Sequence, residues 1–302
     1  MTPRPKRIAA LAERGFSPPG ALRFPYARLM TETLVRDALT EDAADNDLTS
    51  IATIVSDRSN RCSIVARVDG VIAGIPLARE AFRQRNPRVS VRSSVKDGQR
   101  VSAGAPVLHV SGHARGLLSA ERVALNFMQR LSGIATLTHE FVDAVAGTSA
   151  KILDTRKTTP GWRRLEKYAV RSGGGLNHRM DLGAALLIKD NHIAALDGDI
   201  AAAISRARET APPGIRVEVE CDSLDQVREA LKAKPDIIML DNMTVRMLRQ
   251  AVEIIDGRAV SEASGGVNLI TVRAIAETGV DWISVGALTH SAKALDLGLD
   301  FL

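Results

Sequence analysis

Along the second half of the chain, short apolar runs alternate with longer stretches in which apolar residues recur at helical spacing. Short apolar runs bounded by turn signals are typical of buried strands. The stretches between them carry helix signals: Ser223 and Gln226 have capping-box spacing, and Gly279 lies where a helix C-cap is expected. Strands that alternate with helices pair in parallel, and the repetition favours a closed βα barrel. The six predicted barrel strands cover residues 151–154, 185–188, 217–220, 237–240, 259–262 and 282–285.

The first part of the chain has a different pattern. An amphipathic helix is predicted over residues 26–36 and a longer helix over residues 114–131. Between them, alternating or apolar segments predict short strands at residues 62–68, 89–91 and 106–110. This order is typical of a small sheet with helices packed on it.

Together the two patterns predict an α/β protein with two domains. The expected fold class is an N-terminal α/β sandwich domain followed by a C-terminal incomplete βα barrel. The sandwich domain is predicted over residues 1–130, completed by residues 291–302, and the barrel over residues 131–290.

The composition excludes several classes of protein. Hydrophobic residues make up 45% and charged residues 25% of the 302 residues, as in ordinary globular domains. No apolar run approaches the roughly 18 residues that a membrane span requires. Two widely separated cysteines, Cys62 and Cys221, fit a reducing compartment, so a cytoplasmic protein is expected.

The charge balance points to a small ligand. Lys and Arg exceed Asp and Glu by 40 to 35, which favours an anionic partner. Aromatic residues are only 3% of the chain, so the stacking platforms that single-stranded nucleic acid requires are missing. A small anionic ligand is therefore expected, with no nucleic acid or membrane partner.

Unusual polar or glycine residues end or follow every one of the six predicted barrel strands. In βα barrels the loops after the strands converge on one rim, which holds the active site. The pattern therefore predicts an active site at the carboxyl ends of the strands. In strand order the residues are Arg156 and Lys157, Lys189, Glu220, Asp241, Ser264 with Gly265 and Gly266, and Gly286 with Ala287.

A cationic group among these residues suits an acidic ligand. Guanidinium groups grip carboxylates and phosphates bidentately, and clustered cations neutralise the repulsion between two anionic reactants in a dry pocket. The group consists of Arg156, Lys157, Arg179 and Lys189, together with His178.

An acidic pair and two glycine turns complete the pattern. Glu220 and Asp241 are suited to ribose hydroxyls or a Mg²⁺ ion. The turns at residues 264–266 and 286–287 come last in the barrel, the usual position of a phosphate site built from backbone N–H groups. The sequence therefore predicts an enzyme that brings a phosphorylated sugar to an acidic partner.

The chain also carries a series of longer motifs. They are ERVALN at residues 121–126, LSGIAT at 131–136, DTRKTTPG at 154–161, LEKYAV at 165–170, GGG at 173–175 before NHR at 177–179, LIKDNHI at 187–193, IMLDNM at 238–243, EASGG at 262–266 and ISVGALTH at 283–290. In this order they strongly resemble the family of quinolinate phosphoribosyltransferase, also called nicotinate-nucleotide pyrophosphorylase (carboxylating). The resemblance covers nearly the whole chain from about residue 30 onward.

The resemblance implies a reaction. Phosphoribose passes from 5-phosphoribosyl-1-pyrophosphate to the ring nitrogen of quinolinate, with loss of pyrophosphate and carbon dioxide, to give nicotinate mononucleotide in de novo NAD biosynthesis. It also implies Mg²⁺ as cofactor, held by Glu220 and Asp241 largely through substrate and water.

The resemblance further implies roles for individual residues. Lys157, Lys189, Glu220 and Asp241 are the expected catalytic residues. The quinolinate pocket is expected to involve both arginines of the cationic group, His178 and Lys189, and the two glycine turns are expected to cradle the 5-phosphate. The full set of expected substrate-binding residues is Arg122, Thr155, Arg156, Lys157, His178, Arg179, Lys189, Glu220, Asp241, Ser264, Gly265, Gly266, Val285, Gly286 and Ala287.

The resemblance also bears on assembly. In the family, the arginine that matches Arg122 enters the active site from a neighbouring subunit. We therefore expect a homodimer, or a hexamer built as a trimer of dimers, with shared active sites.

Other functions remain open on the sequence alone. One is a paralogue of the same fold, linked to molybdate uptake, that uses a different acceptor. Lys189 at a strand end could instead serve as the amine nucleophile of a Schiff-base lyase. A third is a nucleotide-binding module without catalysis. His290 is compatible either with the phosphate rim or with packing.

Overall fold

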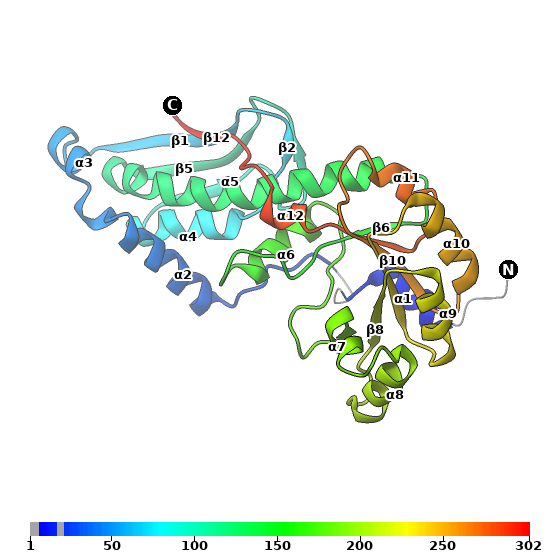
Figure 1. Ribbon diagram of the computed structural model, residues 1–302. Coiled ribbons are helices and arrows are strands. Elements are labelled where there is room, and N and C mark those ends of the chain that lie inside the picture. The colour runs from blue at the N-terminus through cyan, green and yellow to red at the C-terminus, as the bar shows by residue number, and fades with distance from the viewer. Residues whose placement is uncertain (1–5, 17–20) are drawn as a thin grey trace. The chain divides into compact units, whose positions relative to one another are not determined.

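The computed structural model describes residues 6–16 and 21–302, which form two compact units (Figure 1). The barrel unit comprises the described part of residues 1–20, residues 140–163 and residues 175–291. The sheet unit comprises residues 21–139, 164–174 and 292–302. The predicted fold class, an N-terminal sheet domain with an incomplete βα barrel, is confirmed.

The two units differ in part from the predicted ranges, residues 1–130 with 291–302 and residues 131–290: the described part of residues 1–20 belongs to the barrel unit, whereas residues 292–302 belong to the sheet unit as predicted. The helix α5 (Ala114–Ala144) continues well past residue 131, because Ile134, Ala135 and Phe141 extend its buried face. The units therefore divide within α5. Residues 164–174 also belong to the sheet unit, although they lie inside the predicted barrel range.

The sheet unit contains a four-stranded antiparallel sheet in the order β12-β1-β5-β3. The strand β12 comes from the last residues of the chain and forms one edge of this sheet. The strands are β1 (Ser59–Ala66), β3 (Ser90–Ser93), β5 (Pro106–His113) and β12 (Leu297–Phe301), with β2 (Gly70–Val71) and β4 (Arg100–Val101) as a separate pair.

Helices pack closely in the sheet unit. A Cβ atom on Gly116 of α5 would lie 3.0 Å from the carbonyl oxygen of Arg85, the last residue of α4 (Ile75–Arg85), so glycine permits the contact. Figure 1 shows α4 and α5 running along β1 and β5, where Ile64, Phe82 and Leu108 are fully buried. The remaining helices are α2 (Arg28–Glu41), the 3₁₀ helix η1 (Ala44–Asn46), α3 (Leu48–Thr53), α4 (Ile75–Arg85) and α6 (Arg163–Ser172).

The barrel unit is built on a six-stranded parallel sheet in the order β6-β11-β10-β9-β8-β7. All six strands lie where the sequence pattern predicts them, to within two residues at each end. They are β6 (Lys151–Leu153), β7 (Leu186–Ile188), β8 (Val217–Cys221), β9 (Ile237–Asp241), β10 (Val260–Ser264) and β11 (Trp282–Ser284).

The sheet does not close into a complete barrel, because β6 and β7 are its two edges. Residues 175–179 run beside β6, where the Leu176 N–H donates to the Ile152 carbonyl at 2.8 Å and the Asp154 N–H donates to the Leu176 carbonyl at 3.2 Å. They contribute only an isolated bridge to β6. The barrel is thus incomplete, as the expected fold class has it, and not the closed form that the alternation of strands and helices alone favours. A seam, across which the described residues show no strand pairing, separates residues 175–179 from β7.

Three helices of the barrel unit, α8, α9 and α10, begin at side-chain caps. The Ser223 hydroxyl accepts the Gln226 N–H at 3.4 Å, as the capping-box spacing predicts, and Gly279 adopts a φ of 87° after the end of α11. The Thr244 hydroxyl likewise accepts the Met247 N–H at 3.3 Å. The helices are α7 (Asp190–Ala194), α8 (Ile200–Thr210), α9 (Leu224–Lys232), α10 (Val245–Ile255), α11 (Val272–Ala276) and α12 (Ala287–His290).

A further helix, α1 (Lys6–Arg14), is not among the elements that the sequence pattern predicts. Its buried face, Ile8, Leu11 and Ala12, packs on residues at the starts of barrel strands, including Trp282. The Trp282 indole N–H donates to the Ala12 carbonyl at 2.9 Å. The helix thus covers the amino ends of the strands, opposite the predicted active-site rim.

None of the helices in the described part of the chain is both long enough and apolar enough to cross a membrane.

Candidate active site

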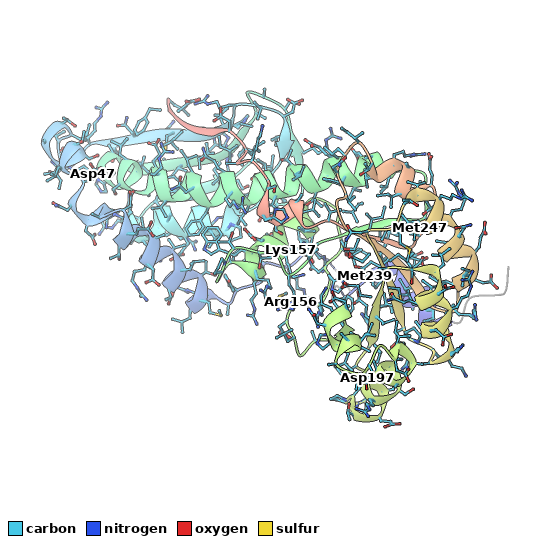
Figure 2. The ribbon with its side chains drawn as sticks, in the orientation of Figure 1. Asp47, Arg156, Lys157, Asp197, Met239 and Met247 are labelled. Carbon is cyan, nitrogen blue, oxygen red and sulfur yellow. The ribbon has the colours of Figure 1, made fainter. Side chains whose placement is uncertain are left out.

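A cavity of about 600 Å³ opens at the carboxyl ends of the barrel strands. It brings together most of the residues that the sequence predicts for the active site. Lys157, in the loop after β6, and Met239, in β9, both line it and are labelled in Figure 2. The full lining is Thr155, Lys157, Lys189, Glu220, Met239, Asp241, Asn242, Ser264, Gly265, Gly266, Val267, Ser284, Val285, Gly286, Ala287 and His290.

Lys189 and Glu220 form an ion pair inside this cavity. The Lys189 Nζ lies 2.5 Å from a Glu220 carboxylate oxygen, across the neighbouring strands β7 and β8. The Lys189 side chain is 47% exposed, so solvent screens the pair and its contribution to stability is small. An ammonium group held by a carboxylate is also not a free amine, which disfavours the Schiff-base lyase.

Asn242 connects Asp241 to the first glycine turn, residues 264–266, by hydrogen bonds. The Asn242 side-chain amide donates to the Asp241 carboxylate at 2.6 Å, and the Asn242 main-chain N–H donates to the Ser264 carbonyl at 2.9 Å. Gly265 has a φ of 97°, and a Cβ atom there would lie 2.9 Å from the Asn242 nitrogen. Only glycine satisfies both conditions. Gly266, with a φ of 60°, faces open space, so the turn presents its backbone to the cavity.

The second glycine turn is tied to the loop that carries Lys157. The Thr289 hydroxyl donates to the Lys157 carbonyl at 2.6 Å, and a Cβ atom on Gly286 would lie 3.2 Å from the Lys157 Cδ. His290, whose Nδ1 lies 2.7 Å from the Ser291 hydroxyl, lines the same cavity. The structure therefore favours the rim position for His290 over a purely packing role.

Two of the predicted cations, Arg156 and Arg179, lie near each other and outside the set of described residues that line the cavity. Arg179 is buried, and its Nη1 donates to the Ala185 carbonyl at 2.9 Å, just before β7. Burial lowers the pKa of Arg179, and the charge of Arg156 lowers it further. The Arg156 Nε is buried without a hydrogen-bond partner among the described residues. An anion shared by the two guanidinium groups would relieve their repulsion.

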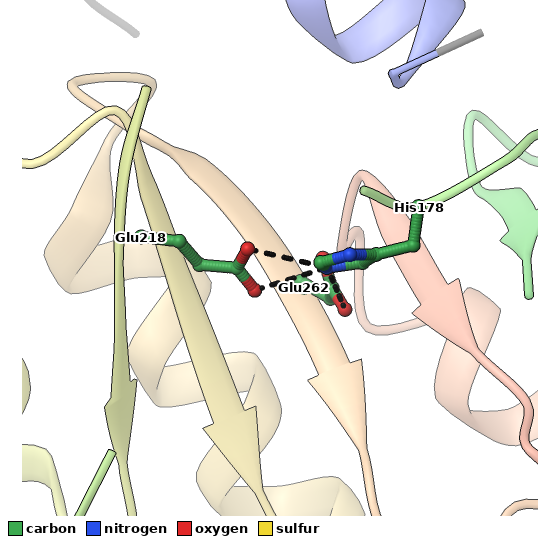
Figure 3. A group of neighbouring side chains, drawn as sticks. All are labelled: His178, Glu218 and Glu262. Atoms are coloured by element: carbon green, nitrogen blue, oxygen red, sulfur yellow. Dashed lines mark hydrogen bonds and ion pairs between the residues drawn. The ribbon is translucent and has the colours of Figure 1, made fainter. Parts of the chain in front are cut away.

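His178 is directed into the barrel interior, where it meets Glu218 of β8 and Glu262 of β10 (Figure 3). Its Nε2 lies 3.2 Å from both Glu218 oxygens and 3.5 Å from a Glu262 oxygen. The His178 side chain is 6% exposed, and both carboxylates are fully buried. The prediction placed His178 on the quinolinate pocket, whereas in the structure its ring belongs to this interior cluster.

The surroundings of His178 and Glu218 shift their pKa values and determine which ring nitrogen of His178 carries a proton. Burial lowers the pKa of His178, but the two carboxylates outweigh it and raise the pKa to about 10. Burial also raises the pKa of Glu218. The His178 Nδ1 accepts the Arg179 main-chain N–H at 2.8 Å, so the ring proton lies on Nε2. The raised pKa of His178 favours a second ring proton, and its uptake on Nδ1 would displace the bond from the Arg179 N–H.

Sequence reasoning missed Glu218 and Glu262 as members of the site. Their signal is an acidic residue in the middle of a strand that the sequence predicts to be buried. In a strand, residues two apart face the same side, so Glu218 shares the face of Glu220, and Glu262 shares the face of Ser264. Each therefore lies one layer beneath a cavity-lining residue.

Arg122 belongs to the sheet unit, where it is exposed on α5. Its predicted entry into the active site of a neighbouring subunit stays a prediction.

A parallel βα barrel with a charged cavity at the carboxyl ends of its strands has the arrangement of an enzyme. Comparison with protein families gives the particular class. The model of the quinolinate phosphoribosyl transferase C-terminal domain matches residues 134–300, and that of the N-terminal domain matches residues 47–132. The chain belongs to the quinolinate phosphoribosyl transferase family, which confirms the resemblance seen in the sequence.

Individual relatives cover nearly the whole chain. It is 48% identical to the nicotinate-nucleotide pyrophosphorylase (carboxylating) of Mycobacterium leprae (strain TN), over 88% of this chain and 95% of the relative. It is 43% identical to a probable nicotinate-nucleotide pyrophosphorylase (carboxylating) of Bacillus subtilis (strain 168), over 90% and 93%. The solved nicotinate-nucleotide pyrophosphorylase of Francisella tularensis matches with a TM-score of 0.87 and 39% identity, over 94% of this chain and 100% of that chain.

Proposed function

We propose that this protein is a decarboxylating quinolinate phosphoribosyltransferase. It transfers phosphoribose from 5-phosphoribosyl-1-pyrophosphate to quinolinate and forms nicotinate mononucleotide, pyrophosphate and carbon dioxide. The observation that carries this proposal is the single cavity in which Lys157, Lys189, Glu220 and Asp241 meet both glycine turns. The names of the relatives support it.

The cations accommodate quinolinate, which is a dianion. Arg156 and Arg179 bind its carboxylates, since their guanidinium groups lie close together and the Arg156 Nε has no partner among the described residues. Lys189 supports the same substrate from the end of β7. Arg122 of a neighbouring subunit completes the pocket in a homodimer or in a hexamer of dimers.

The glycine turns and carboxylates hold the co-substrate. Backbone N–H groups of residues 264–266 and 285–287 cradle the 5-phosphate. Glu220 and Asp241 bind the ribose hydroxyls, while Lys157 and Thr155 face the pyrophosphate. Glu220 and Asp241 also offer the oxygen ligands that Mg²⁺ prefers, so with substrate and water they would hold that ion. When bound, Mg²⁺ supplies positive charge to the leaving pyrophosphate.

Residues of the cavity then favour the transfer of phosphoribose and the decarboxylation that follows. The bond between the ribose C1 and the pyrophosphate oxygen breaks, and the positive charge left on the ribose is stabilised by the carboxylates of Glu220 and Asp241. The quinolinate ring nitrogen donates its electron pair to C1. The cationic ring then accepts the electrons released as the adjacent carboxylate leaves as carbon dioxide, and a proton takes its place. Positioning is the main requirement of this second step.

The proposal includes a cytoplasmic location, which suits the two buried free cysteines.

The direct test supplies purified protein with quinolinate labelled in the carboxylate next to the ring nitrogen, the pyrophosphate co-substrate and Mg²⁺. We expect labelled carbon dioxide and nicotinate mononucleotide in equal amounts. Omitting the co-substrate should abolish both products, which controls for decarboxylation without transfer. If the protein binds the co-substrate but forms no nucleotide, it uses another acceptor and the proposal fails.

A further inference from the structure

His178, Glu218 and Glu262 form a buried cluster in the barrel interior (Figure 3). Glu218 precedes the cavity-lining Glu220 by two residues, and Glu262 precedes Ser264 by two. Two residues of a strand span about 6.6 Å, so the cluster supports the floor of the site. It is close to the chemistry without lining the cavity.

Stability alone does not explain this cluster. Taking two carboxylates out of water is costly, and apolar residues of similar volume often stabilise a protein more. Here one oxygen of Glu218, which lies 3.2 Å from the His178 Nε2 in an ion-pair contact, and one oxygen of Glu262 have no hydrogen-bond partner among the described residues. The one further bond to these carboxylates comes, among the described residues, from the Ser284 hydroxyl, 2.5 Å from a Glu262 oxygen. Such incompletely satisfied groups indicate a role in function.

Hydrogen bonds connect the cluster to Arg179, which we propose binds quinolinate. The His178 ring is held by the carboxylates at Nε2, and at Nδ1 it accepts the Arg179 N–H at 2.8 Å. The Asp154 carboxylate accepts the His178 main-chain N–H at 2.8 Å. The Arg179 guanidinium then donates to the Ala185 carbonyl across the seam. Residues 178 and 179 lie at the seam, where strand pairing is missing, and these side-chain hydrogen bonds hold them in place.

We propose that Glu218 and Glu262 are positioning residues of the transferase, which hold His178 and through it fix Arg179 for the acidic substrate. This inference rests on the proposed function. Because His178 connects the cluster to Arg179, its loss weakens quinolinate binding more than co-substrate binding.

The test compares steady-state constants of Glu218→Gln and Glu262→Gln with the wild type. Glutamine keeps the shape of the side chain but removes the charge. We expect the KM for quinolinate to rise at least tenfold and the KM for the co-substrate to change less than twofold. The matched control is Asp281→Asn, since Asp281 is a buried barrel carboxylate that accepts the Ser261 N–H at 2.9 Å, away from the cavity. It should lower the melting temperature without changing either KM.

A double-mutant cycle tests whether the carboxylates act through His178. We expect Glu218→Gln to change the KM for quinolinate by less than twofold once His178→Gln is present, because the link is already broken. If Glu218→Gln does not fold, Glu262→Gln and Ser284→Ala, which removes the hydroxyl bonded to Glu262, carry the same test.

Three outcomes overturn the inference. One is a wild-type enzyme that forms product while the variants keep the normal KM for quinolinate. Another is additive effects in the cycle. The third is one equivalent of bound zinc that the variants lose, because these three residues would then be metal ligands. An inactive wild type would instead refute the proposed function, so the two failures are distinguishable.

Discussion

Glu166 in the sheet unit and Glu218 in the barrel unit are both fully buried, but their surroundings differ. Glu166 of α6 receives the Arg130 guanidinium of α5 at 2.8 Å, and Arg130 also donates to the Ala292 carbonyl at 3.0 Å. This pair joins three segments of the sheet unit. Glu218 shares a single imidazole with Glu262, and each of those two carboxylates keeps an oxygen without a hydrogen-bond partner among the described residues.

The difference shows how two similar side chains serve different purposes. A buried carboxylate that meets a guanidinium group is compensated and fastens elements together. A buried carboxylate pair that shares one imidazole keeps part of its electrostatic cost uncompensated. Glu166 therefore fastens segments of the sheet unit, whereas Glu218 lies beneath the reactive cavity of the barrel unit. Four predictions test this contrast.

The largest effect is expected from Lys157→Ala. Removing a cation that faces developing negative charge should lower kcat/KM by about 10²–10³-fold. Lys151→Ala is the matched control, since Lys151 lies at the other end of the same region, where its Nζ is 3.8 Å from Glu13. Steady-state kinetics should show a loss only for Lys157. Equal losses in the two variants would mean that net charge, not position, matters.

Mixing two inactive variants tests the contribution of the sheet unit to catalysis. If Arg122 acts in the neighbouring subunit, Arg122→Ala mixed with Lys189→Ala should recover about a quarter of the wild-type activity, because half of the dimers are mixed and each then has one intact site. Mass spectrometry would establish that subunits exchange. Exchange without recovery would place Arg122 in its own subunit's site or outside any site.

Glu166→Gln should affect stability and not catalysis. The substitution removes the negative charge that faces the Arg130 guanidinium, which should cost about 1–3 kcal/mol of unfolding free energy. Urea unfolding measures the loss, and the KM for quinolinate should stay unchanged. A selective rise in the KM for quinolinate would mean that Glu166, like Glu218, acts on substrate binding, and the contrast between the two glutamates would fail.

The smallest effect concerns pH and Asp97. Burial raises the pKa of Asp97, although the Tyr168 hydroxyl at 2.7 Å and the N–H groups of Gly74 and Ile75 lower it. The folded state therefore takes up this proton at a higher pH than the unfolded chain. Stability from this group is present at low pH and is lost as the pH rises from the ordinary value of 3.8 through the raised pKa.

Urea unfolding of the wild type and Asp97→Asn at pH 4.5 and pH 7 measures this contribution. The advantage of the wild type over the variant should be larger at the lower pH. A larger advantage at pH 7 would mean that the ionised Asp97 carboxylate is better stabilised in the folded protein than in water.

Much of the barrel could be predicted from the sequence, because each strand is a short apolar run that ends at a polar or glycine residue. Lys189, Glu220 and Asp241 could be placed together, since parallel strands bring their carboxyl ends to one rim. Glu218 could not be recognised, because alternating valine and glutamate is equally typical of a strand with one face in water.

Other features depend on contacts between distant parts of the chain. The helix α1 is short, and its partner Trp282 lies far away in the sequence, so local pattern alone does not predict it. The seam was missed because residues 175–179 lack the apolar repetition of a strand, and only the bonds of Leu176 to β6 show where they run.

The close approach of Gly265 to Asn242 has a consequence for the evolution of the protein. Any larger residue at position 265 collides with Asn242, whereas Gly266 faces open space. The loops after β9 and β10 therefore cannot diverge independently. In an alignment of descendants, changes at positions 242 and 265 should occur together, while position 266 should be limited only by its left-handed backbone.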